Sequence, residues 1–187
     1  MIKAGAIDKG MCLLMKEEPY LVAEREFVNP GKGSAFVRVK LKSLRTGQVL
    51  RETFKSNDTV EEADVYDRPS QYLYGDDTEY HFMDTDTYDQ FTVSRGGLED
   101  RGSYMKEGDT YTVVMWEAKP IDVKLPYKMV YVVTEAQQAI KGDTVTGATK
   151  PVKVETGLEV KVPIFIKEGD KVLVNTETGE YVERVND

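Results

Sequence analysis

The sequence has one cysteine, one histidine, one tryptophan and no long apolar run in its 187 residues. A single cysteine excludes an internal disulfide and fits a reducing compartment. No segment approaches the roughly 20 apolar residues that cross a bilayer, so we expect no membrane partner. Residues 1–6 lack the apolar core and cleavage site of a signal peptide. We therefore expect a cytoplasmic protein.

The net charge of −8 disfavours a nucleic-acid partner at first sight, but the charge is unevenly distributed. The balance is +1 over residues 1–64, −6 over residues 65–128 and −3 over residues 129–187. Within residues 27–55, seven basic side chains face a single acidic one, Glu52, which leaves a local excess of +6. A basic patch of this kind favours contact with phosphates even on an acidic protein.

Hydrophobic side chains alternate with a period of two along most of the chain, which is typical of β-strands. In residues 34–42, for example, Val37, Val39 and Leu41 point to one face of the predicted strand. Turn signals separate many such segments, a pattern that indicates small β-barrels or sandwiches. One helical turn is expected around residues 97–105. The other predicted strands cover residues 11–16, 19–28, 48–55, 70–75, 79–84, 88–94, 110–117, 120–125, 129–134, 158–166, 171–175 and 180–185.

The alternation breaks at two places, in the polar stretch 56–64 and at Leu125-Pro126-Tyr127. These breaks predict three units, at residues 1–64, 65–128 and 129–187. Units of this size bury limited apolar area, so we expect each to pack against a neighbour.

Lys32 is the strongest candidate for a functional side chain. It lies between two predicted strands, in the hairpin segment Pro30-Gly31-Lys32-Gly33. Proline restricts φ and glycine permits positive φ, so the lysine is expected on a tight tip without bulky neighbours. Such a tip can extend one amine into a narrow channel or present it to a modifying enzyme. The alternative is an ordinary solvated hairpin lysine.

Arg38, Lys40 and Lys42 alternate with the apolar residues of the next strand and so share its other face. Alternate residues of a strand are about 6.6–6.8 Å apart, close to the spacing of successive phosphates in a nucleic-acid strand. This row can follow a phosphate backbone. The alternative is a solvated outer face.

Several carboxylates could suggest a metal site or a paired-carboxylate hydrolase. They alternate with aromatic residues beside hairpin turns, which favours a solvated acidic face. The sequence therefore predicts no catalytic residue, no metal and no cofactor. The carboxylates are Asp76, Asp77, Glu79, Asp84, Asp86 and Asp89.

Motifs over essentially the whole chain resemble bacterial elongation factor P. The first group is the tip, Phe27–Phe36, followed by Arg38–Leu41. Further motifs are Arg45-Thr46-Gly47, Thr53–Ser56, Gln71–Tyr74, His81-Phe82-Met83, Lys141–Thr144, Lys150-Pro151, Glu155-Thr156-Gly157, Val162–Phe165 and Gly179–Val182.

The resemblance implies an all-β protein, with an SH3-like (KOW-type) barrel at residues 1–64 and OB-fold barrels at 65–128 and 129–187, in an L-shaped, tRNA-like arrangement. It implies a non-enzymatic elongation factor that binds the 70S ribosome between the P and E sites. Such a factor stimulates peptide-bond formation at consecutive prolines. Lys32 would reach the peptidyl-transferase centre beside the CCA end of the peptidyl-tRNA.

The resemblance also implies the partners and their contact residues. It implies an enzyme that modifies Lys32 and leaves open β-lysyl-lysine, an aminopentanol adduct or an unmodified form. We expect a monomer in solution. The residue types alone leave a generic OB/KOW single-stranded RNA-binding protein as the alternative. The implied contacts are Arg38, Lys40, Lys42, Arg45 and Lys55 with tRNA or rRNA, Gly142, Asp143 and Thr144 near the E-site codon, and Tyr181 and Arg184 with the ribosome or tRNA.

Overall fold

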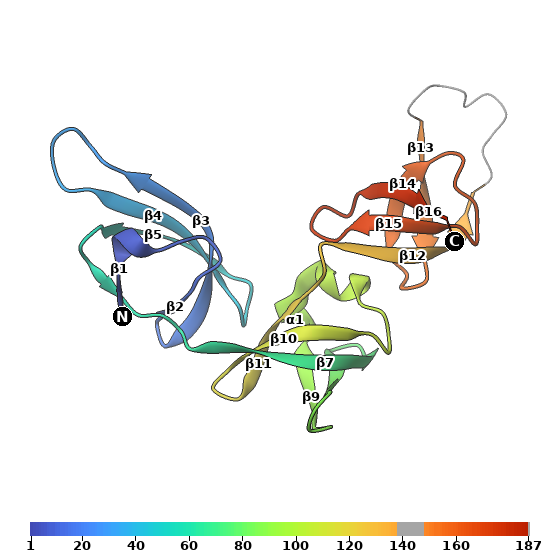
Figure 1. The fold of residues 1–187 in the computed structure, drawn as a ribbon, viewed down its shortest axis with the longest axis horizontal. Coiled ribbons are helices and arrows are strands. Elements are labelled where there is room, and N and C mark those ends of the chain that lie inside the picture. The colour runs from blue at the N-terminus through green and yellow to red at the C-terminus, as the bar shows by residue number, and fades with distance from the viewer. Residues whose placement is uncertain (138–147, 187) are drawn as a thin grey trace. The chain divides into compact units, whose positions relative to one another are not determined.

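A computed structural model describes residues 1–137 and 148–186, and these form two compact units. The first unit contains residues 1–99 and 110–124, and the second contains residues 100–109 and the chain from 125 onward. Strands dominate both units (Figure 1), as the predicted all-β class requires. Within the described residues, no helix is long and apolar enough to cross a bilayer.

The N-terminal barrel is a four-stranded antiparallel sheet in the order β2-β3-β4-β5, and a short β1–β6 pair lies beside it. Alternation along β4 buries Val37, Val39 and Leu41, which are at most 3% exposed. They pack with Ile7 and Leu13 in one apolar core. The strands are β1 (Ile2–Lys3), β2 (Cys12–Met15), β3 (Glu18–Val28), β4 (Phe36–Ser43), β5 (Val49–Lys55) and β6 (Thr59–Val60), and a 3₁₀ turn η1 (Ala4–Ala6) follows β1.

The second sheet of the first unit has five antiparallel strands in the order β11-β10-β7-β8-β9. Its edge strands β9 and β11 approach each other, so the sheet curls into a barrel. Phe82 is fully buried inside it. The elements are β7 (Val65–Gly75), β8 (Glu79–Asp84), β9 (Gln90–Ser94), α1 (Arg95–Leu98), β10 (Thr110–Trp116) and β11 (Lys119–Lys124).

A small apolar cluster joins these two sheets within the first unit. Leu44, which follows β4, packs with Val114 and Ile121 of the second sheet. Cys12 and Trp116 pack at the edge of the same cluster. Trp116 therefore packs at the contact between the two sheets. Cys12 lies at the same contact, and its burial raises the pKa of its thiol.

The sheet of the second unit is also five-stranded and antiparallel, in the order β14-β13-β12-β15-β16. Tyr131 of β12 is fully buried, and its hydroxyl donates a 2.6 Å hydrogen bond to the carbonyl of Tyr104. Tyr104 ends the 3₁₀ helix η2 (Glu99–Tyr104). The strands are β12 (Lys128–Ala136), β13 (Thr149–Val154), β14 (Glu159–Pro163), β15 (Lys171–Asn175) and β16 (Tyr181–Val185).

The strands differ from the sequence prediction at a few places. β13 was not predicted, because Pro151 and the lysines beside it obscure the alternation of Val152 and Val154. β7 begins at residue 65 rather than 70, and Pro69 lies inside it. The helical segment begins at Arg95, two residues before the predicted turn. The predicted boundaries after residues 64 and 128, and the L-shaped arrangement, stay predictions.

The core of the N-terminal barrel gives a stability prediction. Leu41→Ala removes a fully buried side chain and should lower the free energy of unfolding by about 2–5 kcal/mol. Val49→Ala in the same sheet removes a side chain that is 48% exposed and should cost less than about 0.5 kcal/mol. Urea unfolding followed by Trp116 fluorescence measures both, and equal effects would contradict the assigned core.

Candidate functional site

The loop between β3 and β4, residues 29–35, presents Lys32 at the end of a hairpin. Figure 1 shows this hairpin as a blue arm that extends beyond the rest of its barrel. Lys32 is exposed, as are Gly31 and Gly33 on either side of it. Gly33 has φ +106°, and an added Cβ at either glycine would meet no atom within 4 Å. The backbone on both sides of the lysine is therefore open, and Gly33 supplies the positive φ that the turn requires.

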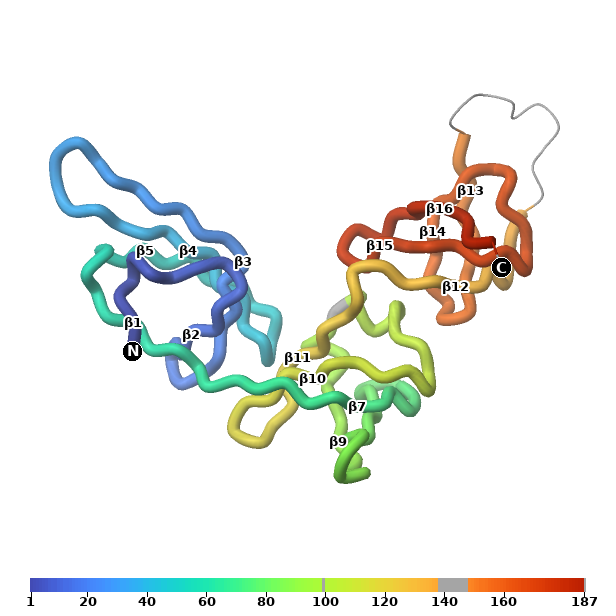
Figure 2. Tube along the Cα trace, viewed as in Figure 1, coloured from blue at the N-terminus to red at the C-terminus, as the bar shows by residue number. Residues whose placement is uncertain are grey.

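A three-stranded base supports this tip. β4 pairs with β3 on one side and β5 on the other, up to the level at which Phe36 lies between Val28 and Lys55. Just beyond that level the amide of Ser56 donates a 2.9 Å hydrogen bond to the carbonyl of Ala35. Only the loop projects past the paired strands, and the Cα trace in Figure 2 shows no other segment of the barrel beside the loop.

The ammonium of Lys32 makes no hydrogen bond or ion pair with any residue that the structure describes. If the tip folded back onto carboxylates of its own barrel, the Lys32 ammonium would form an ion pair within the protein and would not be available to a partner. The open amine is consistent with contact to a partner.

The outer face of this sheet carries the basic residues named from the sequence. Arg38 and Lys40 alternate with the buried valines of β4. Register places Arg51 of β5 beside Lys40, and Lys55 beside Phe36. Lys42 lies further from the tip, opposite Leu21. Arg45 follows β4 at the far end of the strand and forms an ion pair with Glu18, so it does not belong to the same row.

Two carboxylates that the sequence reading did not include also lie on this face. Glu24 of β3 accepts a 2.9 Å hydrogen bond from the Lys40 ammonium, and Glu26 lies 3.6 Å from the Arg38 guanidinium. The hydrogen bond from Lys40 lowers the pKa of the Glu24 carboxyl. Both glutamates precede residue 27, so they lie outside the segment 27–55 that carries the local excess of +6. They appear only once the register of β3 against β4 is known.

The remaining predicted contacts lie in the second unit. Tyr181 is half-buried in β16, opposite Val174, and Arg184 is exposed in the same strand. The Arg184 guanidinium lies 5.9 Å from the centre of the Phe165 ring, an arrangement that restrains a long cationic side chain. Gly142, Asp143 and Thr144 lie outside the described residues.

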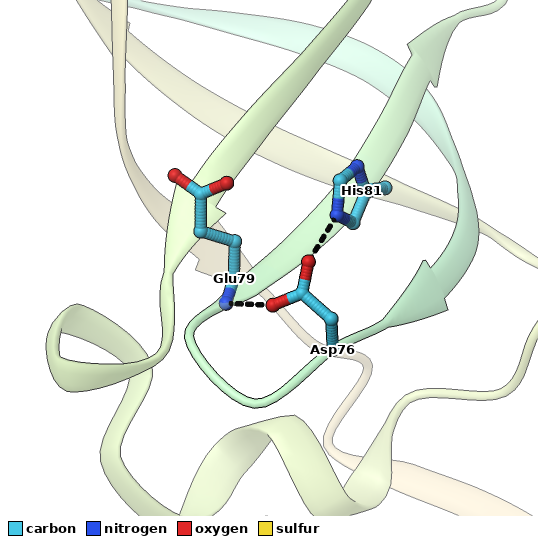
Figure 3. Close-up of side chains that lie close together, drawn as sticks. All are labelled: Asp76, Glu79 and His81. Atoms are coloured by element: carbon cyan, nitrogen blue, oxygen red, sulfur yellow. Dashed lines mark hydrogen bonds and ion pairs between the residues drawn. The ribbon is translucent and has the colours of Figure 1, made fainter.

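The suspected carboxylate cluster is a hairpin closure between β7 and β8. One oxygen of Asp76 accepts hydrogen bonds of 2.8 Å from the amides of Thr78 and Glu79. Its other oxygen accepts a 2.7 Å hydrogen bond from Nε2 of His81, and Figure 3 shows the bonds to Glu79 and His81. These bonds, chiefly that from His81, hold the pKa of the Asp76 carboxyl well below its usual range. The His81 ring also stacks on Tyr74.

This cluster contains the types of side chain that bind metal ions. One ligand atom from each of Asp76, Glu79 and His81 lies within 4.8 Å of the others. However, both oxygens of Asp76 already accept hydrogen bonds, and Glu79 accepts one from Thr92. The group satisfies the donors of a tight turn, as expected for an Asp that follows a strand.

Asp84 at the other end of β8 has a similar structural role. It is 5% exposed, pairs with Arg68 and accepts bonds from the amides of Asp86 and Thr87. The Arg68 hydrogen bond and these amides lower the pKa of Asp84 to about 2. The carboxylates at both ends of β8 therefore hold turns in place.

Comparison with known families gives the same architecture. Family models match residues 3–60 as the KOW-like domain of elongation factor P, residues 65–123 as its OB domain and residues 129–184 as its C-terminal domain. Among solved structures, eukaryotic translation initiation factor 5A from Methanococcus jannaschii is similar in fold, with a TM-score of 0.55 at 17% identity over 66% of this chain and 90% of that chain.

Curated relatives match over the full length. Elongation factor P from Treponema pallidum (strain Nichols) is 56% identical and that from Treponema denticola is 55% identical, each over 100% of both chains. Elongation factor P from Borrelia duttonii is 50% identical over 98% of this chain and 97% of its own. These matches define a translation factor built from small β-barrels. The chain belongs to the elongation factor P family.

The hydrogen bonds of Asp76 predict that the stability of the protein depends on pH. Folding lowers the pKa of the Asp76 carboxyl, so these bonds contribute fully to stability above the ordinary pKa of 3.8. That contribution is lost as the pH falls below 3.8 and toward the lowered pKa. Asp76→Asn should lower the thermal midpoint at neutral pH and should converge with wild type in acid. Thermal melts across this pH range test the expectation, with Asp77→Asn as the matched exposed control. A constant difference between wild type and Asp76→Asn at every pH would contradict it.

Zinc distinguishes turn closure from a metal site. An ion that binds the folded state and not the unfolded state raises the thermal midpoint of the protein by mass action. If Asp76, Glu79 and His81 only close the hairpin, excess Zn²⁺ should shift wild type and Asp76→Asn equally. A larger shift of wild type would reveal a site.

Proposed function

We propose that this protein acts on the 70S ribosome, between the P and E sites, and stimulates peptide-bond formation at consecutive prolines. The observation that carries the proposal is the free ammonium of Lys32 on a projecting tip with a three-stranded base. Membership of the elongation factor P family supports it. The site of action places the protein in the cytoplasm, where it acts as a monomer.

In the proposed complex, Lys32 reaches the peptidyl-transferase centre and lies beside the CCA end of the peptidyl-tRNA. Arg38, Lys40 and Lys42, with Lys55 at the base of the tip and Arg45 at the far end of β4, contact the phosphates of that tRNA or of rRNA. Cations at alternate positions of a strand match the spacing of phosphates in one nucleic-acid strand. Gly142, Asp143 and Thr144 contact the small subunit near the E-site codon, and Tyr181 and Arg184 contact the ribosome or tRNA.

The proposed mechanism is positional. Proline attacks slowly as a nucleophile, and a poorly held peptidyl-tRNA adds an entropic cost to each attempt. A factor that fixes the CCA end reduces that cost, an effect that can reach several kcal/mol in well-oriented systems. A positive charge at the tip also suits a centre surrounded by RNA phosphates. This mechanism requires no acid, base or cofactor on the protein.

Lys32→Ala tests the role of the tip. The side chain is exposed, so folding should be unchanged. The rate of polyproline synthesis in a reconstituted translation system should fall by roughly tenfold or more, close to the rate without the factor. Lys119→Ala removes an exposed lysine beside another hairpin turn, between β10 and β11, and should keep full activity. Full rescue by the Lys32 variant would remove the amine from the mechanism.

The same exposed amine is a substrate for the proposed modifying enzyme. The modification should add mass only to the peptide that contains Lys32. Intact-mass spectrometry with peptide mapping, on protein from its native host and from a host without that enzyme, measures the increment. Added mass on any other peptide, or none on the native protein, would contradict this partner.

A further inference from the structure

We propose that Glu24 and Glu26 act as built-in counter-ions that determine which RNA the outer face of β3–β5 accepts. In the free protein Glu24 forms an ion pair with Lys40, and Glu26 forms one with Arg38. RNA that contacts this face alone therefore gains little binding free energy. The inference takes its partner, RNA phosphate, from the proposed function and adds a specificity role for two acidic residues.

A β-bulge places these carboxylates. The register of β3 against β4 shifts between Val22 and Glu24, which leaves Ala23 as an extra residue. Without the bulge, alternation from Leu21 would bring Arg25 to the face of Lys40 and Arg38, and the charged side chains of that face would all be basic. With it, Arg25 turns to the opposite side, where it bonds the carbonyl of Gly5. Bulges re-aim side chains in this way.

The pairs are strong enough to form and weak enough to exchange. The glutamate side chains are 69% and 64% exposed for Glu24 and Glu26, and their partners Lys40 and Arg38 are 33% and 58% exposed. Exposed ion pairs of this kind contribute little and are screened by salt. A correctly held phosphate can therefore replace a carboxylate.

The charges on the face change in order across the sheet. β3 contributes two carboxylates, β4 contributes two cations paired with them, and β5 contributes Arg51 and Lys55. Neither β5 side chain forms an ion pair with any residue in the described part of the chain. A phosphate backbone along β5 and β4 meets cations, whereas one displaced toward β3 meets like charge. Like-charge contacts suppress wrong arrangements of a complex.

This layout matters because the tip supplies a second contact. When Lys32 is held in its own site, the face binds its RNA as an intramolecular step, at a high effective concentration. The contact at the tip then offsets the free-energy cost of displacing the two carboxylates from their cations. Free RNA lacks that second contact, and the carboxylates compete with it. The result is a factor that free cellular RNA does not sequester.

The test uses free RNA and no ribosome. The full chain with Glu24→Gln and Glu26→Gln is titrated with a labelled RNA duplex and with unfractionated tRNA, over a series of salt concentrations. Affinity at low salt should rise about three- to tenfold. The slope of log affinity against log salt should steepen by about 0.7–0.9 for each carboxylate removed, because each cation that loses its carboxylate neutralises one more phosphate and releases the counter-ion of that phosphate.

Glu61→Gln with Glu62→Gln is the matched control. It removes the same charge from exposed positions of the same barrel, outside β3–β5. If net charge alone matters, the two double variants tighten equally and the inference is overturned. It is also overturned if the Glu24/Glu26 variant binds like wild type or more weakly. Thermal melts check that all variants are folded.

This outcome is separable from the proposed function. Rescue of polyproline synthesis by Lys32→Ala would refute the mechanism at the tip and leave the free-RNA titration unaffected. Conversely, unchanged RNA affinity in the Glu24/Glu26 variant would refute the counter-ion role and leave the tip assay intact.

Discussion

Side chains alternate between the two faces of a strand, so the register between β3 and β4 decides which charges lie together on the N-terminal barrel. A slip of one residue would move every side chain of β3 to the other face. The bulge at Ala23 is such a slip, confined to one point of the strand. On the tip side of the bulge, Glu24 and Glu26 share a face with Arg38 and Lys40. On the other side, Leu21 shares that face and packs into the cluster around Leu44.

One strand therefore serves two purposes. Its first part belongs to the apolar contact between the two sheets of the first unit, and its second part carries charge toward the tip. The same pairing gives the loop a firm base, because β4 has a partner on both sides up to Phe36. An isolated two-stranded hairpin is marginal in water. Here the third strand and the core under Val37 and Val39 hold the base, and only seven residues project beyond it.

Much of the fold was predictable because alternation of burial is local. The spacing of Val37, Val39 and Leu41 alone predicts that they share one face of a strand, and in the structure all three are buried. Two hairpin turns use positive φ at Lys16-Glu17 and at Glu117-Ala118, residue types that give no turn signal, and the sequence located them only as gaps between predicted strands. The missed features have non-local or unusual causes. Pro69 lies inside β7 with no break in its pairing to β10.

The site was predictable in its exposed tip, because glycine and proline around Lys32 carry their own conformational signal. The charge of the neighbouring face was not, because it depends on which strand lies beside β4 and on a bulge within that strand. A window along the sequence counts neighbours in the chain, whereas the field at Lys40 is set by neighbours across the sheet. Glu24 is sixteen residues from Lys40 in sequence and 2.9 Å from it in space.

This difference bears on how an acidic protein can use a basic face. At physiological salt, interactions between exposed charges fade over about 8 Å, while adjacent strands are about 4.8 Å apart. Most of the charges that make up the net charge of −8 lie farther than this from a phosphate bound on the face, and salt screens them. The carboxylates that such a phosphate feels are those one or two strands away. On this face they are Glu24 and Glu26. In our proposal, selectivity for RNA follows from the arrangement of two glutamates around two cations more than from the total charge of the chain.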